Sequence, residues 1–415
     1  MKSIKQDLVN IKQIAYTLLD VNDHQCNKIL LELANLLEDN ITNIIYYNKL
    51  DLAKMPKDDP KYDRLELNEI RIRSLSHDLR KVSELDSPLN KVLEFKELPN
   101  GLKLEKKTVP LGVIAVIYEA RPNVTIDVFS LCLKSGNVSV LKGGTDAWET
   151  NSYLVSLIKK SLINNGLDAN LVYLMPPERE AVYELLNAVG LIDVCIPRGS
   201  QSLINFVRDN AKIPVIETGA GIVHTYIDES ANLEFASKII YNAKTRRVSV
   251  CNALDCVIIH KNKLNDLPKI VNKLSEKNVI IYADQKSFDE LKNNYPKHLL
   301  YMADDASFGC EFLDYKLSIK TVNSIDDAIK HIMKYTSGHS EAIVAEDSKA
   351  ITRFLNIVDA AVVYVNTSTA FTDGGEFGMG AEIGISTQKL HARGPMSVSE
   401  LTSYKWIVYG DGQIR

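Results

Sequence analysis

Cys251 is the cysteine of this 415-residue chain whose setting favours reactivity. It lies in the segment TRRVSVCNALDC, between a predicted helix and a predicted strand, shortly after Arg246 and Arg247. Nearby cations lower the pKa of a thiol toward a reactive thiolate. A thiolate attacks an acyl carbon and forms a thioester, which divides one difficult step into two. Cys251 is therefore a candidate nucleophile, although its neighbours in sequence are a weak signal on their own.

The other cysteines and the histidines predict no metal site. The six cysteines are scattered, without a Cys-x-x-Cys pair, and the pattern is typical of cytosolic thiols. Cysteines and histidines also lack the paired spacing of a zinc site. Cys256 falls within an apolar strand and His224 on another strand, so we expect both to be buried core residues. No Gly-x-Ser-x-Gly elbow appears.

Two segments that follow predicted strands could meet a nucleotide. VLKGG (140–144) places Lys142 at a strand end, and PRGSQSLI (197–204) places Gly199 and Ser200 at the start of a helix, where anions bind favourably. The chain has no Gly-x-Gly-x-x-Gly and no Walker loop. Each segment alone could be an ordinary turn without a ligand. Two such segments at neighbouring strand ends favour a nucleotide cofactor.

Three further segments carry polar or glycine-rich sequence at element ends. ETGAG (217–221) places Glu217 at a strand end, FTDGGEFGMGAEIG (371–384) suggests close backbone approach to a ligand or partner, and HARGP contributes His391 and Arg393. The alternative for each is a solvated loop.

The spacing of apolar residues along the chain predicts the helices and strands that position these residues. Residues 1–90 show apolar residues at helical spacing, and residues 91–109 alternate around a PNG turn, which predicts a β-hairpin. Strands are predicted at 112–118, 138–141, 171–174, 191–196 and 213–216, and in a second block at 255–260, 278–283, 341–345 and 360–366, with helices between them. This alternation predicts parallel sheets covered by helices, whose ligands bind beyond the carboxyl ends of the strands. The final run YKWIVYG could pair with the hairpin.

Length and composition limit the class of protein. At roughly 150 residues per domain the length predicts two or three domains. The formal net charge of −4 argues against a general nucleic-acid binder. No apolar run is long enough to span a membrane, and the polar N-terminus predicts a cytoplasmic protein.

Several segments together resemble the gamma-glutamyl phosphate reductase family of the aldehyde dehydrogenase superfamily. They are VPLGVIAVIYEARPNVTIDVFSLCLKSGN, LKGG, PVIETGAG, VCNALD, FTDGGEFGMGAEIGISTQKLHARGP and LTSYKWIVYGDGQIR, and they run from residue 109 to the C-terminus. One departure is the Val-Ser in TRRVSVCNAL, where the family usually has Pro-Gly. The shape of that loop is therefore less secure than its chemistry.

The resemblance implies reduction of L-glutamyl 5-phosphate by NADPH to L-glutamate 5-semialdehyde, the second step of proline biosynthesis from glutamate. Cys251 then displaces phosphate and forms a thioacyl enzyme, and Asn123 with the Cys251 backbone N–H stabilises the oxyanion. Glu217 matches the superfamily's general base, although hydride rather than water resolves the thioester.

The resemblance also implies the binding residues. Lys142 would meet the adenine ribose and 2′-phosphate of the cofactor, Gly199 and Ser200 the pyrophosphate, and Glu311 would match the family's ribose-holding glutamate. The substrate's carboxylate and phosphate need cations, for which the candidates are Arg121, Arg246, Arg247 and Arg393.

We therefore expect an α/β fold of the aldehyde dehydrogenase type. A Rossmann-like NADP-binding domain would cover 1–90 and 110–228, and a smaller catalytic domain 229–366. Residues 91–109 and 367–415 would form an oligomerisation flap and C-terminal segment, giving a dimer or tetramer. A separate glutamate kinase would supply the substrate. Two alternatives remain: a related reductase for another acyl group, and a non-catalytic nucleotide-binding protein.

Overall fold

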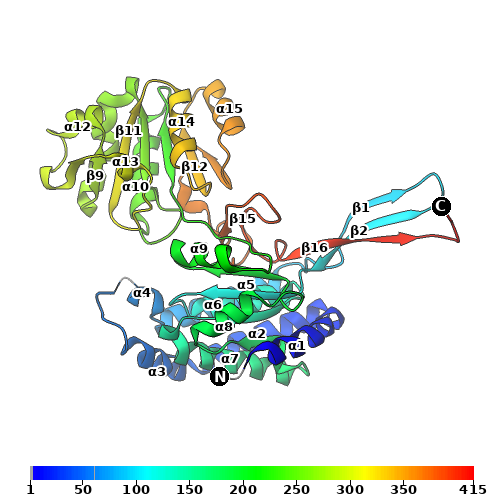
Figure 1. The fold of residues 1–415 in the computed structure, drawn as a ribbon. Coiled ribbons are helices and arrows are strands. Elements are labelled where there is room, and N and C mark those ends of the chain that lie inside the picture. The colour runs from blue at the N-terminus through cyan, green and yellow to red at the C-terminus, as the bar shows by residue number, and fades with distance from the viewer. Residues whose placement is uncertain (1–2, 60) are drawn as a thin grey trace. The chain divides into compact units, whose positions relative to one another are not determined.

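The computed structural model describes residues 3–59 and 61–415, which form two compact units (Figure 1). Unit 1 comprises Met1–Thr218, Gly378–Gly384 and Pro395–Arg415, and unit 2 comprises Gly219–Phe377 and Ile385–Gly394. No helix among the described residues is both long enough and apolar enough to cross a membrane. The functions predicted for the domains stay predictions.

The N-terminal part of unit 1 is helical, as the sequence predicts. Its helices are α1 (Lys5–Ile14), α2 (Asp23–Asp39), α3 (Ile41–Leu52), α4 (Tyr62–Leu65) and α5 (Glu69–Glu84), with a 3₁₀ turn η1 (Ala15–Asp20). Asn22 and Asn68 begin α2 and α5, because each side-chain oxygen accepts a backbone N–H of the first turn. The apolar stripe of α2 is buried, which fixes the face that it turns to the core.

A four-stranded parallel sheet forms the centre of unit 1, in the order β5-β4-β3-β6. Its strands are β3 (Val113–Tyr118), β4 (Val138–Lys142), β5 (Val172–Leu174) and β6 (Val194–Arg198), and the connecting helices are α6 (Asn123–Lys134), α7 (Trp148–Asn164), α8 (Arg179–Leu186) and α9 (Gln201–Asn210). The strand predicted at 213–216 is wrong. Only an isolated bridge joins Cys195 and Val215, since Pro214 has no N–H with which to extend a ladder.

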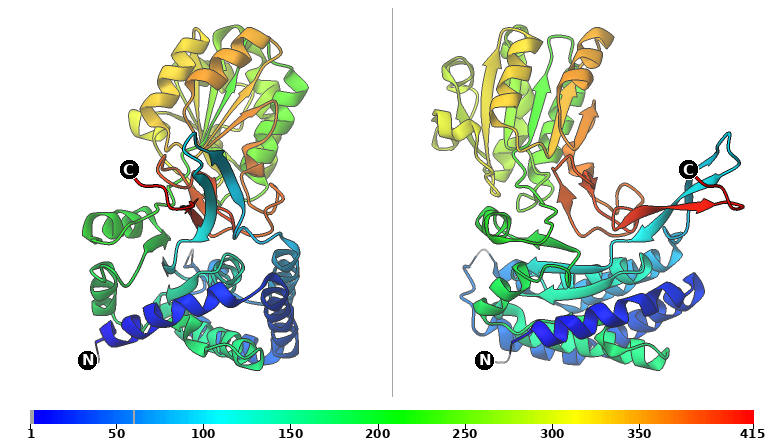
Figure 2. Two further views of the ribbon diagram at one scale, coloured as in Figure 1. Left: turned by 90° about the vertical axis from the view of Figure 1, so that its right-hand side faces the viewer. Right: turned by 45° about the vertical axis from the view of Figure 1, so that its right-hand side comes forward.

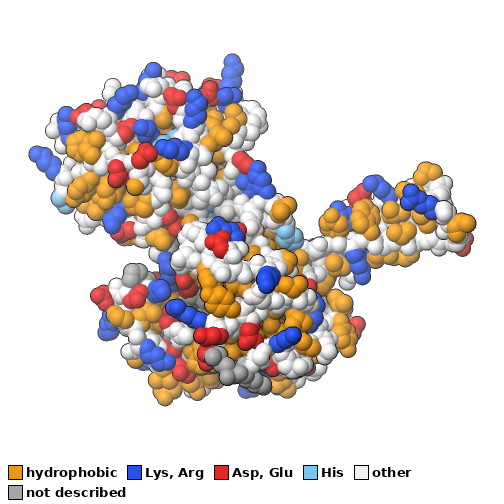
Figure 3. Space-filling model, viewed as in Figure 1, with side chains coloured by type: hydrophobic (Ala, Val, Ile, Leu, Met, Phe, Trp, Pro, Cys, Tyr) orange, Lys and Arg blue, Asp and Glu red, His pale blue; other side chains and the backbone are white. Residues whose placement is uncertain are grey.

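Three antiparallel strands form an arm of unit 1: β1 (Val92–Glu97), β2 (Lys103–Pro110) and β16 (Thr402–Tyr409), in the order β1-β2-β16. The predicted hairpin and its pairing with the C-terminal run are confirmed (Figures 1 and 2). Apolar side chains of this arm lie at its surface, among them Phe95, Trp406 and Val408 (Figure 3). The oligomerisation predicted for it stays a prediction.

Unit 2 is built on a seven-stranded parallel sheet, in the order β10-β9-β11-β8-β7-β12-β13. The strands are β7 (His224–Ile227), β8 (Cys256–His260), β9 (Ile280–Ala283), β10 (Leu300–Met302), β11 (Lys316–Val322), β12 (Ser340–Val344) and β13 (Val362–Val365). Helices lie on both faces (Figure 2) and bury a separate apolar cluster on each. They are α10 (Leu233–Thr245), α11 (Leu267–Val271), α12 (Gln285–Leu291), α13 (Asp305–Phe308), α14 (Ile325–Tyr335) and α15 (Ser348–Ile357).

The predicted strand ranges include none of β7, β10 and β11, although a strand was expected at His224. β7 and β10 are short, and β11 interrupts its apolar residues with lysines. The single helix predicted between the strands at 255–260 and 278–283 is instead α11 flanked by the 3₁₀ segments η4 (Lys261–Asp266) and η5 (Asn272–Lys277). The remaining strands, β14 (Ile385–Ser386) and β15 (Gly394–Pro395), have two residues each and pair with one another.

Candidate active site

Cys251 is half-exposed in the loop that joins α10 to β8 in unit 2. Burial raises the pKa of the other five thiols. The pKa rises to about 12 for Cys26, Cys195 and Cys256, and it also rises for Cys132 and Cys310. A thiolate is the attacking form, so burial disfavours these five as nucleophiles.

Gly221 of the ETGAG segment packs directly against the backbone of Cys251. A Cβ atom at Gly221 would lie 1.6 Å from the carbonyl oxygen of Cys251, so no other residue fits without moving the loop. The Gly221 N–H donates to Glu311 at 2.9 Å. Glu311 therefore holds the loop segment before β7 against which Cys251 rests, and its predicted contact with the cofactor stays a prediction.

The residue after Cys251 joins the nucleophile loop to the glycine-rich tail. The buried Asn252 amide donates to the carbonyl oxygens of Ala370 at 3.3 Å and Thr372 at 3.1 Å. In return the Thr369 hydroxyl donates to the Asn252 carbonyl at 2.9 Å. Thr387 of the same tail packs on Gly219. Three of the segments that carry the family resemblance thus meet around Cys251.

A buried charged pair forms the base of this loop. Lys244, at the end of α10, donates to the Leu254 carbonyl at 2.9 Å, and its Nζ lies 4.0 Å from the Asp255 carboxylate. Burial lowers the pKa of Lys244 to about 8 and raises the pKa of Asp255 to about 7. Sequence reasoning missed both residues. No local pattern pointed to them, because the segment between them, TRRVSVCNAL, is itself polar and charged.

The four candidate substrate arginines differ in their settings. Arg246 and Arg247 are exposed at the end of α10, and Arg246 donates to the Ala370 carbonyl at 3.4 Å. Arg393, also in unit 2, pairs with Asp359 at 2.6 Å. Arg121 belongs to unit 1 and is half-buried just before α6. Arg393 is therefore already neutralised, whereas Arg246 lies beside the nucleophile loop.

Asn123 is the first residue of α6 in unit 1. Its amide donates to Asp127 at 3.0 Å, and loss of solvation raises the pKa of Asp127 to about 7. An asparagine amide carries two N–H donors. Asp127 therefore orients the side chain while one N–H remains for another acceptor.

The start of α9 already binds a carboxylate. Ser200 caps the helix, and its backbone N–H and hydroxyl donate to the two oxygens of Glu119, each at 3.0 Å. A Cβ at Gly199 would lie 2.8 Å from the same carboxylate. The predicted pyrophosphate site thus has donors of the right kind, and Glu119 at the end of β3 satisfies them. The sequence pattern did not indicate that Glu119 would occupy this position.

Lys142 ends β4, and its ammonium group is buried. It donates to the carbonyl oxygens of Gly143 at 3.0 Å and Pro177 at 3.2 Å. Burial lowers its pKa, and the nearby Glu178 and Asp146 oppose that change. Two carbonyl partners leave one of its three N–H donors for a ligand.

Glu217 lies at the end of unit 1, half-buried, with its carboxylate 3.8 Å from Arg208 of α9. Glu217, Asn123, Lys142, Ser200 and Arg121 are therefore in unit 1, and Cys251 and Glu311 are in unit 2.

No family model matches the chain. A curated gamma-glutamyl phosphate reductase from Legionella pneumophila (strain Paris) is 64% identical over 387 residues, which are 93% of this chain and 93% of the relative. The chain belongs to the gamma-glutamyl phosphate reductase family. The resemblance seen in its sequence is thereby confirmed.

Solved structures agree with this membership. The crystal structure of the gamma-glutamyl phosphate reductase of Thermotoga maritima matches with a TM-score of 0.94 and 37% identity over 100% of both chains. An acetylating aldehyde dehydrogenase from Geobacillus thermoglucosidasius matches with a TM-score of 0.72 at 16% identity over 100% of both chains. The predicted α/β fold of the aldehyde dehydrogenase type is confirmed for this family member.

Proposed function

We propose that this chain reduces L-glutamyl 5-phosphate with NADPH to L-glutamate 5-semialdehyde and phosphate, the second step of proline biosynthesis from glutamate. The observation that carries the proposal is the 64% identity, over 93% of the chain, to a relative named gamma-glutamyl phosphate reductase. The setting of Cys251 supports it: the thiol is half-exposed, and the loop that holds it is built from the family's own segments.

The first chemical step is attack of the Cys251 thiolate on the acyl carbon of the substrate. A carbon–sulfur bond forms, the carbonyl electrons move to oxygen, and the tetrahedral oxyanion then collapses with loss of phosphate. The Asn123 amide and the Cys251 backbone N–H donate to that oxyanion, and Asp127 orients the amide. One such donor is worth about 3 kcal/mol of transition-state stabilisation.

The second step reduces the thioester. NADPH, when bound, supplies the hydride to the thioester carbon. Hydride addition leaves a hemithioacetal oxyanion on Cys251; its charge returns to form the carbonyl, the carbon–sulfur bond breaks, and the aldehyde leaves as the thiolate is restored. Water has no part in resolving the thioester, so Glu217 has no obligatory role as a deacylating base.

The cofactor residues of unit 1 fit a dinucleotide phosphate. The start of α9 binds an anion in its present state, since Glu119 receives both Ser200 donors, and a pyrophosphate there would replace that carboxylate. Lys142 has a remaining N–H for the 2′-phosphate, beside the opposing charges of Glu178 and Asp146. We assign Glu311 to the ribose on resemblance alone.

The substrate's two anionic groups require cations. Arg246 and Arg247 suit the phosphate, because they are exposed beside the nucleophile loop. Arg121 suits the carboxylate, and Arg393 would first have to leave Asp359.

The proposal also includes a cytoplasmic homo-oligomer built through the β1-β2-β16 arm, and a separate glutamate kinase that supplies the labile acyl phosphate.

The test is the reverse reaction with purified, reduced protein. Glutamate semialdehyde and NADP⁺ should yield NADPH only when phosphate is present. A panel of simple aldehydes and acyl-CoA separates the proposal from the related acyl-thioester reductases, and NAD⁺ in place of NADP⁺ tests the cofactor. Absence of phosphate-dependent turnover with glutamate semialdehyde would refute the proposal.

A further inference from the structure

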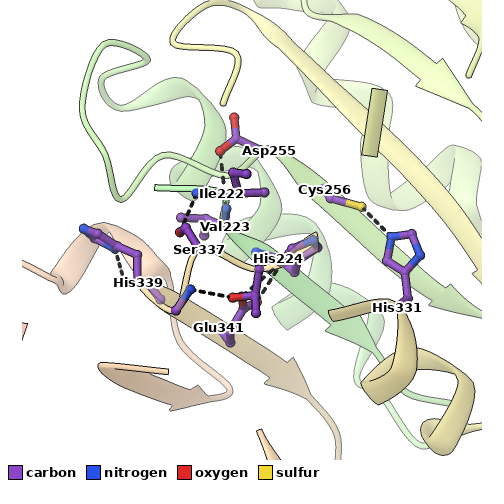
Figure 4. A network of polar contacts seen from close by, with 12 residues as sticks. Ile222, Val223, His224, Asp255, Cys256, His331, Ser337, His339 and Glu341 are labelled. Carbon is purple, nitrogen blue, oxygen red and sulfur yellow. Dashed lines mark hydrogen bonds and ion pairs between the residues drawn. The ribbon is translucent and has the colours of Figure 1, made fainter. Parts of the chain in front are cut away.

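Unit 2 holds a row of three chemically active side chains on adjacent strands. Glu341 on β12 pairs in register with His224 on β7, and His224 pairs in register with Cys256 on β8. Residues in register on neighbouring strands point to the same face of a sheet. His331, on the covering helix α14, completes the group from the opposite side, with its Nε2 atom 3.7 Å from the Cys256 sulfur. Figure 4 shows the His224 ring between Glu341 on one side and Cys256 and His331 on the other.

Glu341 determines which nitrogen of His224 carries a proton. Its carboxylate receives the His224 backbone N–H and contacts Nδ1 at 3.1 Å, and the side chains of both residues are fully buried. A carboxylate accepts hydrogen bonds, so Nδ1 must donate. In a neutral ring the lone pair then lies on Nε2, which has no hydrogen-bond partner although it is buried.

We propose that His224, Cys256 and His331 form a binding site for a divalent transition-metal ion of the zinc class. One ligand atom from each residue lies within 4.8 Å of the others. Tetrahedral zinc with its usual bond lengths places sulfur and nitrogen ligands about 3.6 Å apart. The Cys256 sulfur and the His331 Nε2 atom already have that spacing. The ligand atom of His224 lies within 4.8 Å of both and would need to move closer by about 1 Å. Two imidazoles and a thiolate are a donor set that zinc prefers.

The surroundings of the three ligands agree with this assignment. Glu341 accepts the second ring N–H of His224, as carboxylates commonly do for metal-bound imidazoles, and so orients the ring. Burial lowers the pKa of His331 to about 3, so its ring is neutral and able to bind near neutral pH. The ion would displace the Cys256 thiol proton to solvent and take the thiolate as a ligand. His331 also lines a surface depression with Asp284, Lys320 and Asp327, so this ligand can be reached from solvent.

The sequence predicted no metal site, because its histidines and cysteines lack paired spacing. The three ligands come from β7, β8 and α14, so only the sheet register and the packing of α14 bring them together. The site is distinct from the proposed chemistry at Cys251, which requires no metal.

The test uses the full-length chain, stripped with a chelator and titrated with zinc chloride. Wild type and Cys251→Ser should both bind about one zinc ion per chain. We expect His331→Gln and Cys256→Ser to weaken binding at least about tenfold. His298→Gln changes an exposed histidine of the same unit and should leave the affinity unchanged. Cobalt(II) provides a second readout, a thiolate-to-metal charge-transfer band that persists in Cys251→Ser and is absent from Cys256→Ser.

Each variant is compared only if its far-UV circular dichroism and metal-free melting match those of wild type. His331 is half-exposed, so His331→Gln decides the question if Cys256→Ser does not fold. Failure of wild type to bind zinc, or equal binding by wild type and His331→Gln, would overturn the proposal. Binding that disappears in Cys251→Ser alone would do the same, since it would place the ion on the nucleophile.

Discussion

The two units hold their candidate site residues by different means. Around Cys251 in unit 2 each contact involves a backbone group: Gly221 lies against the Cys251 carbonyl, and the Asn252 side-chain amide donates to two backbone carbonyl groups. At the start of α9 in unit 1 the donors are satisfied by a side chain, Glu119, which can move aside. Substitutions that move the backbone around Cys251 should lower activity strongly. Substitution of a side chain at the start of α9 should change cofactor affinity only moderately. The following predictions test that difference, from the largest expected effect to the smallest.

Replacing the nucleophile should have the largest effect. Cys251→Ala removes the thiolate, so we expect kcat to fall at least about a thousandfold, because losses of this size accompany removal of a covalent nucleophile. The phosphate-dependent NADP⁺ assay measures it. Cys310→Ala is the matched control, since Cys310 is also half-exposed in unit 2, and it should retain wild-type kcat. Equal loss in both variants would show that Cys251 has no special role.

Removing the oxyanion donor should cost less than removing the nucleophile. Asn123→Ala deletes the amide that Asp127 orients, and kcat should fall about 10²–10³-fold with little change in KM. Asn123→Asp keeps the size but loses the donor, so it should be similarly slow. A kcat within twofold of wild type for either variant would remove Asn123 from the mechanism.

Adding one methyl group at Gly221 should disturb the nucleophile without touching the substrate. The new Cβ would meet the Cys251 carbonyl oxygen, and displacing a reacting group by about 1 Å costs about 10²-fold in rate. Gly309→Ala is a control in the same unit, because its new Cβ would meet only a Tyr335 side chain, at 3.1 Å. If Gly221→Ala and Gly309→Ala had the same kcat, the backbone around Cys251 would not be fixed as described.

The buried charge of Lys244 should make stability depend on pH. Its folded pKa of about 8 lies below its ordinary value of 10.5, so the unfolded chain binds more protons between these values. The unfolding free energy should therefore rise with pH across this window, by up to about 3 kcal/mol from this group. Denaturant unfolding of wild type and Lys244→Met at pH 8 and pH 10 measures the difference. An equal change in unfolding free energy between pH 8 and pH 10 in both chains would contradict the buried charge of Lys244.

The smallest effect should come from Glu119. Glu119→Gln removes the negative charge that competes for the start of α9, and a carboxylate there is worth about 0.3–1 kcal/mol. The KM for NADPH should fall about two- to fivefold, with kcat unchanged. Glu180→Gln removes an exposed charge from α8 and serves as the control. A rise in KM for Glu119→Gln would mean that Glu119 assists cofactor binding and does not compete with it.

The sequence predicted most of the fold, because apolar runs and helical spacing follow directly from burial. It predicted a strand at His224 without the bounds of β7, and it placed a strand at Pro214, where the missing N–H prevents one. Cys251 and Asn123 could be predicted from motif resemblance. Two contacts of neighbouring segments could not: Glu119 at Ser200, and Glu311 at Gly221, depend on tertiary packing that no local pattern records.

The central claim, that Cys251 is the reactive thiol of this chain, can be tested by competitive alkylation. Native protein is treated briefly with iodoacetamide, with and without glutamate semialdehyde, and the six cysteines are quantified by peptide mass spectrometry. Cys251 should be labelled first and should be protected by the aldehyde, with loss of activity in proportion to its labelling. Faster labelling of Cys310, or labelling of Cys251 that neither inactivates the enzyme nor responds to the aldehyde, would contradict the account.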